Sequence, residues 1–264
     1  NVRAAVESDS YAASAYALNH PEVLLIGQDI RSVPAGQLMR ILGLAPGDLD
    51  LLAACPPCQS FSRLRKRNKR RTVRDSRNHL IKDVLRFIRT FMPKTVLLEN
   101  VPGLSTYWRF LDLLKTLDRL KYFRTHGVLN AANYGVPQRR KRLIVMASRL
   151  GEVSFPKPKS TKVTVREALE ALGCSAKEHF LHREVSRHSK RVREIIRRIP
   201  KDGGSRLELD EKHQLECHKN FNGFKDVYGR MWWDKVAPTI TGSCFNPSKG
   251  RFLHPTLNRA ISLK

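Results

Sequence analysis

One cysteine of this chain stands in a sequence that suits a nucleophile. Cys58 follows Pro56 and Pro57, which stiffen the backbone, in the run Cys55-Pro-Pro-Cys-Gln-Ser-Phe-Ser62 after an apolar segment. The thiolate is the reactive form of cysteine, and nearby positive charge favours it. Residues 61–74 supply such charge through Arg63, Arg65, Lys66, Arg67, Lys69, Arg70, Arg71 and Arg74. We therefore expect Cys58 to attack an electrophilic substrate.

A carboxylate and a basic run flank two other apolar segments. Glu99 follows the apolar residues 95–98, so its carboxyl group can donate a proton or a hydrogen bond at the end of a buried strand. The run Gln138-Arg-Arg-Lys-Arg142 precedes the apolar residues 143–147 and offers guanidinium groups for phosphate or carbonyl oxygens. Taken singly, Glu99 is more typical of a structural carboxylate, such as a helix N-cap or a salt-bridge partner, and the basic run is typical of a surface patch.

The first 150 residues have the pattern of an α/β domain. Apolar runs predict strands at residues 2–7, 23–26, 49–54, 95–99 and 143–147. Helical spacing predicts helices at residues 11–18, 80–91 and 108–120. This alternation indicates a parallel sheet, in which ligands bind beyond the carboxyl ends of the strands. Four side chains lie at or near such ends, namely Glu7, Asp29, Cys58 and Glu99.

The pattern changes after residue 150. Residues 155–159 resemble a linker, and Thr164 with Glu167 forms a capping box that opens a short helix, so a smaller second domain is expected from about Pro156. A helix-like basic stretch at residues 182–201 contains Arg183, Arg187, Lys190, Arg191, Arg193, Arg197, Arg198 and Lys201. From Trp232 the chain is β-prone and rich in turns, and we expect Trp232 and Trp233 to be core residues.

Composition favours a nucleic-acid partner. Lys and Arg number 49 against 24 Asp and Glu, which gives a formal charge of +25 and favours a polyanion. The 5 cysteines form no disulfide framework, and the C-x-x-C of Cys55 and Cys58 lacks the second pair of a zinc site, so we expect a reducing compartment and no metal. No apolar run is long enough to span a membrane, which predicts a cytoplasmic protein.

Three segments together resemble the motifs of C5-cytosine methyltransferases. They are PPCQSFS at 56–62, ENVPG at 99–103 and NYGVPQRRKR at 133–142. Residues 5–11 resemble the ribose-binding segment of that family, residues 28–30 its adenine-binding segment, and residues 238–241 with 251–259 its ninth motif. The resemblance thus extends over nearly the whole chain.

The resemblance implies a fold and a domain order. The fold would be the Rossmann-like fold of S-adenosylmethionine-dependent methyltransferases with its first strand missing, joined to a smaller target-recognition domain. The catalytic domain would comprise residues 1–155, the target-recognition domain residues 156–235, and a return to the catalytic domain residues 236–264. The family's opening glycine-rich loop and closing tenth motif have no counterpart here, so we expect an internal fragment of a bacterial enzyme.

The resemblance also implies a role for each matching residue. Cys58 would attack C6 of a cytosine extruded from duplex DNA, Glu99 would bind N3 and the amine, Arg142 would bind O2, and Arg140 a phosphate. S-adenosyl-L-methionine would be bound by Glu7, Asp29, Ile30 and Leu80. Further substrate contacts would come from Pro56, Gln59, Ser60, Asn100 and Gln138.

Partners and alternatives complete the expectations. We expect a monomer that acts on duplex DNA. We also expect it to be accompanied by a restriction endonuclease that is specific for the same site. Departures from the family at Ser8, Ala54 and Cys55 put cofactor affinity in question. The alternatives are the tRNA-methylating branch, whose Cys-Phe-Thr signature is replaced at residues 244–246 by Cys-Phe-Asn, and a non-catalytic DNA-binding relative.

Overall fold

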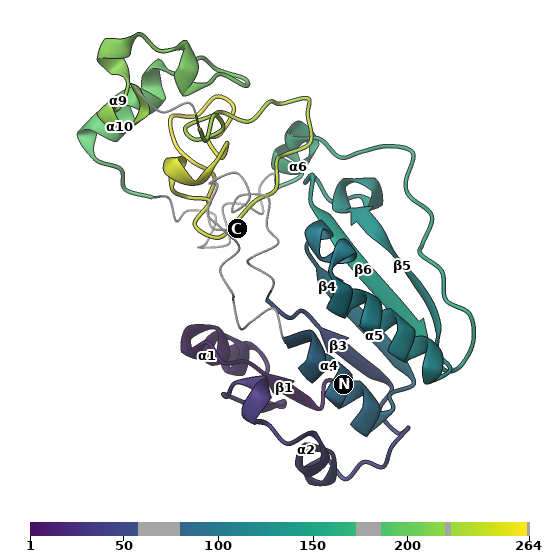
Figure 1. The fold of residues 1–264 in the computed structure, drawn as a ribbon. Helices are drawn as coiled ribbons and strands as arrows, with labels where there is room; N and C mark the ends of the chain where they lie inside the picture. Colours follow the sequence, from purple (N-terminus) through teal and green to yellow (C-terminus); the bar gives the residue numbers. More distant parts are fainter. Residues whose placement is uncertain (58–79, 173–185, 220–222, 263–264) are drawn as a thin grey trace. The chain divides into compact units, whose positions relative to one another are not determined.

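The structure is a computed structural model that describes residues 1–57, 80–172, 186–219 and 223–262. The chain divides into two compact units (Figure 1). The first comprises Asn1–Leu129 and Lys141–Pro156, and the second comprises Asn130–Arg140 and Lys157–Lys264. The first unit carries the paired strands, whereas the described part of the second consists of short helices, turns and isolated bridges.

The strands of the first unit form two sheets. They are β1 (Ala4–Val6), β2 (Leu24–Ile26), β3 (Leu51–Ala54), β4 (Thr95–Asn100), β5 (Phe123–Asn130) and β6 (Lys141–Ser148). β1 pairs in parallel with β2, and the other strands have the order β3-β4-β6-β5. β3 and β4 are parallel, but β4 and β6 are antiparallel. The prediction of a parallel sheet is therefore wrong for β6, because the short connection 131–140 reverses the chain without a helical crossover.

The strand β5 has no counterpart among the predicted strands. Its polar residues Arg124, Thr125 and His126 interrupt the apolar run by which the other strands are recognisable. The remaining strands overlap the predicted segments and differ from them only at their ends. An edge strand needs fewer apolar side chains than a central one, so its place in the sheet order accounts for this composition.

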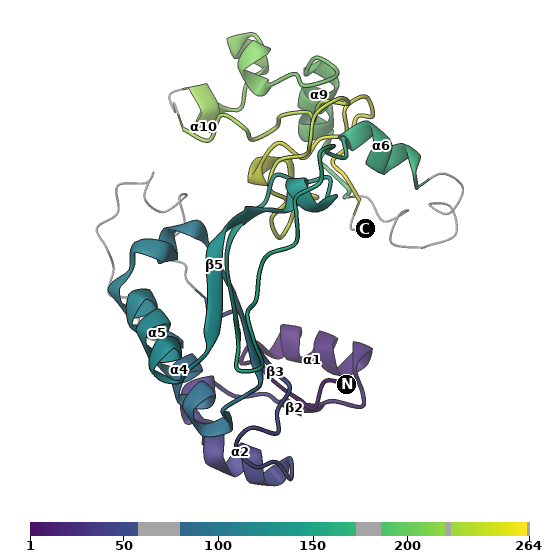
Figure 2. The same cartoon turned by 90° about the vertical axis from the view of Figure 1, so that its right-hand side faces the viewer.

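The described part of the first unit also contains helices, two of which pack against the four-stranded sheet. They are α1 (Ser10–Asn19), α2 (Ala35–Ile41), α4 (Leu80–Phe91) and α5 (Trp108–Arg119), with the 3-10 turns η1 (Ile30–Ser32) and η4 (Pro102–Thr106). Figure 2 shows α4 and α5 on the same side of the sheet. Ile88 of α4 and Leu117 of α5 pack with Leu98 and Val145 of the sheet, all fully buried. The predicted helices are confirmed, while α2 was not predicted. No helix in the described residues could cross a membrane.

The second unit contains little regular structure. Its described elements are η5 (Ala131–Tyr134), α6 (Val165–Glu170), α9 (Lys190–Arg198), η6 (Arg206–Glu208), η7 (Glu211–His213), α10 (Glu216–Lys219) and η8 (Pro247–Lys249). The capping box of Thr164 and Glu167 is present at the start of α6. The β-prone region after Trp232 forms only isolated bridges, such as Leu253 with Arg230 and Ala260, among the residues described. Its prolines remove the donors that a continuous ladder requires.

The two adjacent tryptophans have different surroundings. Trp233 packs against Val165, Met231 and Ala237. Trp232 lies between the side chains of Lys235 and Arg251, whose charged ends are each 4.3 Å from its ring. Trp233 is thus a packing residue, as expected, whereas Trp232 has the charged ends of two basic side chains close to its ring.

A buried arginine organises the second unit. Arg230 is 0% exposed. Its guanidinium group donates to the main-chain carbonyls of Ile196, Ile199, His254 and Leu257 at 2.7–3.1 Å, and to Oδ1 of Asn258 at 2.8 Å. These acceptors belong to the end of α9 and to the segment 254–258. One side chain therefore satisfies carbonyl groups that no regular element satisfies.

The buried His254 makes the second unit sensitive to acid. Its Nδ1 accepts from the N–H groups of Thr256 (3.1 Å) and Leu257 (3.0 Å), so the neutral ring is required. Burial, together with the charges of Arg259, Arg230 and Lys201, lowers the pKa of His254 from 6.5 to about 4. Between pH 4 and pH 6.5, His254 therefore binds a proton in the unfolded chain but not in the folded chain. The free energy of unfolding should therefore fall as the pH drops from 6.5 to 4, by about 2–3 kcal/mol.

Urea unfolding at pH 7.5 and pH 4.5 measures this effect. The His254→Asn variant keeps an acceptor oxygen but cannot titrate, so its free energy of unfolding should depend less on pH than that of the unchanged chain. An equal pH dependence in both proteins would show that His254 is not the titrating group.

Candidate active site and cofactor cavity

The structure brings Glu99 and Arg142 together. Glu99 lies near the end of β4 and Arg142 near the start of β6, on neighbouring antiparallel strands. Nε of Arg142 is 2.6 Å from Oε1 of Glu99, and the side chains are 21% and 32% exposed respectively. A charge-assisted contact of this length fixes the carboxylate while leaving it accessible. Two of the residues predicted to recognise cytosine thus form an ion pair with each other.

Asn100 connects this pair to the segment before the predicted nucleophile. Asn100 is 3% exposed. Its Nδ2 donates to the carbonyl of Pro56 at 2.8 Å, and its Oδ1 accepts from the N–H of Val101 at 2.8 Å. The end of β4 is therefore tied to a point two residues before Cys58. Cys58, Gln59, Ser60 and the basic residues of 63–74 lie outside the described residues.

Cys55 differs chemically from an activated cysteine. Desolvation and the charge of Glu99 raise the pKa of the Cys55 thiol, although a hydrogen bond with the main chain of Glu99 opposes them. Its thiolate is therefore scarce at neutral pH, and reactivity follows the thiolate. This agrees with a structural role for Cys55.

Residues 133–140 belong to the second unit, where two of them contact the 238–241 segment. Gln138 Oε1 accepts from the N–H of Ile240 at 3.1 Å, and the Thr239 hydroxyl donates to the carbonyl of Arg139 at 2.6 Å. The side-chain oxygen of Gln138 thus binds the 238–241 segment. Arg140 belongs to the second unit, whereas Glu99 and Arg142 belong to the first.

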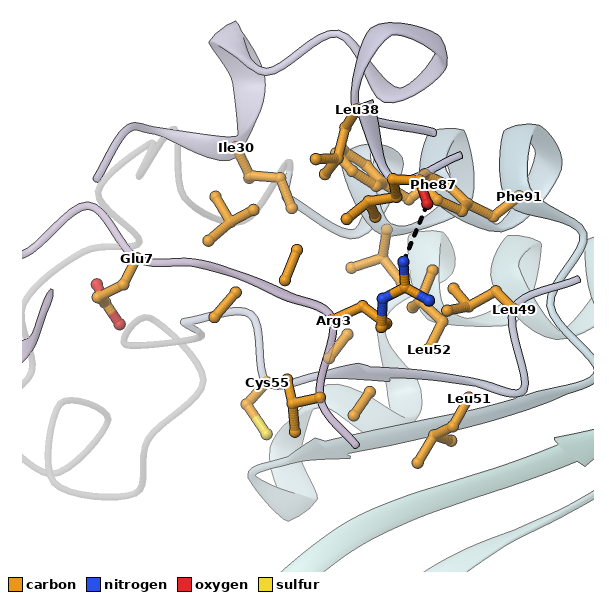
Figure 3. Close-up of a pocket in the computed structure, with 18 of the residues that line it drawn as sticks. Arg3, Glu7, Ile30, Leu38, Leu49, Leu51, Leu52, Cys55, Phe87 and Phe91 are labelled. Atoms are coloured by element: carbon orange, nitrogen blue, oxygen red, sulfur yellow. Dashed lines mark hydrogen bonds between the residues drawn. The ribbon is translucent and has the colours of Figure 1, made fainter. Parts of the chain in front are cut away.

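A large cavity lies in the first unit (Figure 3). Its volume is about 1460 Å³, and the residues of both β1 and β3 line it. Apolar side chains, including Leu38, Leu52 and Phe87, form much of its wall. All the residues predicted to bind the cofactor contribute to its lining, namely Glu7, Asp29, Ile30 and Leu80. Pro56 lines the same cavity.

Glu7 begins the turn between β1 and α1. Its N–H donates to the carbonyl of Ile26 at 3.1 Å, which extends the parallel pairing with β2. Its Oε1 accepts from the N–H of Asp9 at 2.9 Å, and Asp9 in turn caps α1 through the N–H of Ala12. The carboxylate is thus oriented by a short turn at the edge of the cavity.

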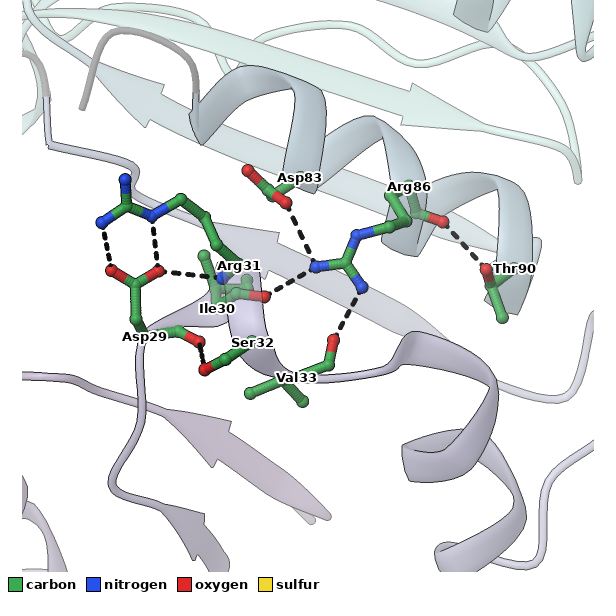
Figure 4. Close-up of polar contacts among 8 residues, drawn as sticks. All are labelled: Asp29, Ile30, Arg31, Ser32, Val33, Asp83, Arg86 and Thr90. Carbon is green, nitrogen blue, oxygen red and sulfur yellow. Dashed lines mark hydrogen bonds and ion pairs between the residues drawn. The ribbon is translucent and has the colours of Figure 1, made fainter. Parts of the chain in front are cut away.

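Asp29 is held by Arg31, which was not among the predicted site residues. Oδ1 and Oδ2 of Asp29 accept from Nε and Nη2 of Arg31 at 2.9 and 2.6 Å, and Oδ1 also accepts from the Arg31 N–H (Figure 4). These contacts lower the pKa of Asp29 to about 2. Asp29 is therefore an ionised acceptor at neutral pH. The Asp-x-Arg spacing was the available signal for this pair.

Two solved structures with this fold are named as methyltransferases. A protein encoded within an E. coli prophage, described as a DNA modification methyltransferase, matches with a TM-score of 0.66 at 20% identity, over 99% of this chain and 79% of that chain. The S. pombe Dnmt2 methyltransferase matches with a TM-score of 0.54 at 18% identity, over 95% of this chain and 66% of that chain. The fold is thus the Rossmann-like fold of S-adenosylmethionine-dependent methyltransferases.

Sequence comparison then gives the family. The model of the C-5 cytosine-specific DNA methylases matches residues 1–264, and the chain belongs to this family. The type II methylase M.HgiDII of Herpetosiphon aurantiacus is 32% identical over 100% of this chain and 75% of its own length. The type II methyltransferase M1.BsuMI of Bacillus subtilis is 32% identical over 81% of this chain and 50% of its own length. The family predicted from the sequence motifs is confirmed.

Proposed function

We propose that this chain transfers a methyl group from S-adenosyl-L-methionine to C5 of a cytosine in duplex DNA. The observation that supports this most is the Glu99–Arg142 contact of 2.6 Å, with Asn100 tying the same strand end to Pro56. The carboxyl group of Glu99 can form a hydrogen bond with N3 of a cytosine ring, and the guanidinium group of Arg142 can form one with O2 of the same ring. The hydrogen bond from Asn100 holds Pro56, two residues before Cys58 in the sequence, at this strand end.

In the proposed reaction, Cys58, Glu99 and Arg142 have different roles. The Cys58 thiolate adds to C6, and Glu99 supplies a proton or hydrogen bond at N3, so that electron density moves to C5. Arg142 binds O2 and holds the Glu99 carboxylate. S-adenosylmethionine, when bound, would supply the methyl group that C5 accepts and would leave as S-adenosylhomocysteine. Loss of the C5 proton to solvent and return of the N3 proton to Glu99 then re-form the C5–C6 double bond and release the Cys58 thiolate.

The cavity of the first unit fits the proposed cofactor. The Glu7 carboxylate suits the hydroxyl groups of a ribose, and the ionised Asp29 suits the exocyclic amine of an adenine. Ile30 and Leu80 present apolar surfaces to the same cavity and can flank the adenine ring.

DNA binding is proposed for the second unit. On α9, Ile195 and Ile196 are buried while the basic side chains are exposed, so the helix presents a cationic face. Glu194 neutralises part of this charge through Arg197 and Arg198 at 3.0 and 2.9 Å. We propose that residues 156–235 are the target-recognition domain and that this face contacts phosphates. We also propose that the protein is a monomer in the bacterial cytoplasm and that a cognate endonuclease accompanies it.

Covalent trapping tests the proposed function. Duplex DNA that contains 5-fluorocytosine should form a complex with the chain that survives denaturant, provided that S-adenosylmethionine is present, because fluorine at C5 blocks the last elimination. Separation on a denaturing gel measures the complex. Trapping on 5-fluorocytosine tRNA but not on duplex DNA would instead favour the tRNA-methylating branch, and trapping on neither would favour a non-catalytic DNA-binding protein.

A further inference from the structure

Arg86 joins the loop that carries Asp29 and Ile30 to the helix that carries Leu80 (Figure 4). Its Nη1 donates to the carbonyl of Val33 and its Nη2 to the carbonyl of Ile30, both at 2.6 Å. Arg86 lies within α4, and both carbonyls belong to η1 or its C-cap. One planar guanidinium group thus spans two carbonyl groups that lie more than fifty positions away in the sequence.

The orientation of Arg86 is itself determined by its neighbours. Nη2 also contacts Oδ1 of Asp83, one turn earlier on α4, at 3.1 Å, and the Asp83 side chain is only 17% exposed. The guanidinium carbon lies 4.9 Å from the ring centre of Phe87. A cation near the last carbonyls of a helical turn is also favoured by the partial negative charge at that end. The contact of Arg86 with the carbonyls of Ile30 and Val33 thus acts as a clamp between the 29–33 loop and α4.

The clamp connects the residues proposed to surround adenine. Asp29 caps η1, Ile30 begins it, and Leu80 is the first residue of α4, so the guanidinium group fixes the spacing between their side chains. We propose that Arg86 is a positioning residue for the cofactor: it holds the Asp29–Ile30 wall of the adenine site at a set distance from the Leu80 wall. This inference rests on the proposed function, since it assumes that these residues bind adenine.

Arg89 provides a matched control on the same helix. It lies one turn after Arg86, and its Nη2 is 3.5 Å from the hydroxyl of Thr116 on α5. Among the described residues it has no hydrogen bond or ion pair with the 29–33 loop, so Arg89→Met removes the same type of side chain from α4 and leaves the clamp intact. Arg86→Lys keeps the charge but can reach fewer carbonyls, because an ammonium group lacks the planar fork.

The test compares Arg86→Met, Arg86→Lys and Arg89→Met with the unchanged chain. Titration calorimetry with S-adenosylhomocysteine, well below the melting temperature, should show a dissociation constant raised about tenfold or more in Arg86→Met, an intermediate value in Arg86→Lys, and little change in Arg89→Met. Hydrogen exchange should be faster at the N–H groups of Ser32 and Val33, which bond within η1, in Arg86→Met only.

The outcomes separate this inference from the function on which it rests. If the unchanged chain binds S-adenosylhomocysteine but Arg86→Met binds it as tightly as Arg89→Met does, the inference alone is overturned. Unchanged exchange at Ser32 and Val33 in Arg86→Met also overturns it. If the unchanged chain does not bind S-adenosylhomocysteine, the proposed cofactor site is wrong and the inference falls with it. A merely structural role predicts a lower melting temperature without a selective loss of affinity.

Discussion

Cys58→Ser should abolish both methyl transfer and the denaturant-resistant complex with 5-fluorocytosine DNA. A serine hydroxyl ionises far less readily than a thiol and is a much weaker nucleophile toward C6 without a strong base beside it. DNA binding should persist, because the +25 charge and the exposed basic face of α9 are unchanged. Gel shift with unmodified duplex DNA measures binding, and the denaturing gel measures the covalent step.

Cys55→Ala is the matched control for this change. Cys55 lies three positions earlier, and its thiol has a raised pKa because of desolvation and the nearby Glu99. It should therefore remain protonated where Cys58 is reactive, and its removal should leave trapping within a few fold of the original rate. If the complex persists in Cys58→Ser but disappears in Cys55→Ala, Cys55 is the nucleophile. That result would overturn the proposed mechanism.

Arg230→Met should cause the largest loss of stability. The methionine fills much of the same space but donates no hydrogen bond, so four main-chain carbonyls lose their donor in an enclosed region. Leaving buried polar groups unpaired on this scale costs about 3–5 kcal/mol. The second unit depends on these contacts because the residues described there form no sheet that could satisfy the same carbonyls.

Tryptophan fluorescence can isolate this effect. A Trp108→Phe background leaves Trp232 and Trp233 as the only tryptophans, and both lie in the second unit. Urea unfolding of Arg230→Met in that background should have a markedly lower midpoint. Arg197→Met, which changes an exposed arginine of α9, should alter the free energy of unfolding by less than about 0.5 kcal/mol. Equal effects of the two changes would contradict the role assigned to Arg230.

Part of the fold was predictable because its signals are local. The stripe of apolar residues at 80–91 gives α4 with its observed ends, and the apolar run at 95–98 gives most of β4. β5 and the antiparallel direction of β6 were not predictable in this way. Strand direction depends on which strands pair, and the polar side chains of β5 are tolerated because it occupies the edge of the sheet.

The candidate site shows the same division. The type, order and spacing of the residues determined the family. They also indicated Cys58, Glu99, Arg142 and the carboxylates Glu7 and Asp29 as site residues. Only the tertiary structure decided that Asn100 binds the carbonyl of Pro56, that Arg86 spans the carbonyls of Ile30 and Val33, and that Arg230 is buried. The acceptors in these contacts are main-chain carbonyls, which every residue type carries. Such contacts leave no pattern in the amino-acid sequence and exist only once distant segments have been brought together.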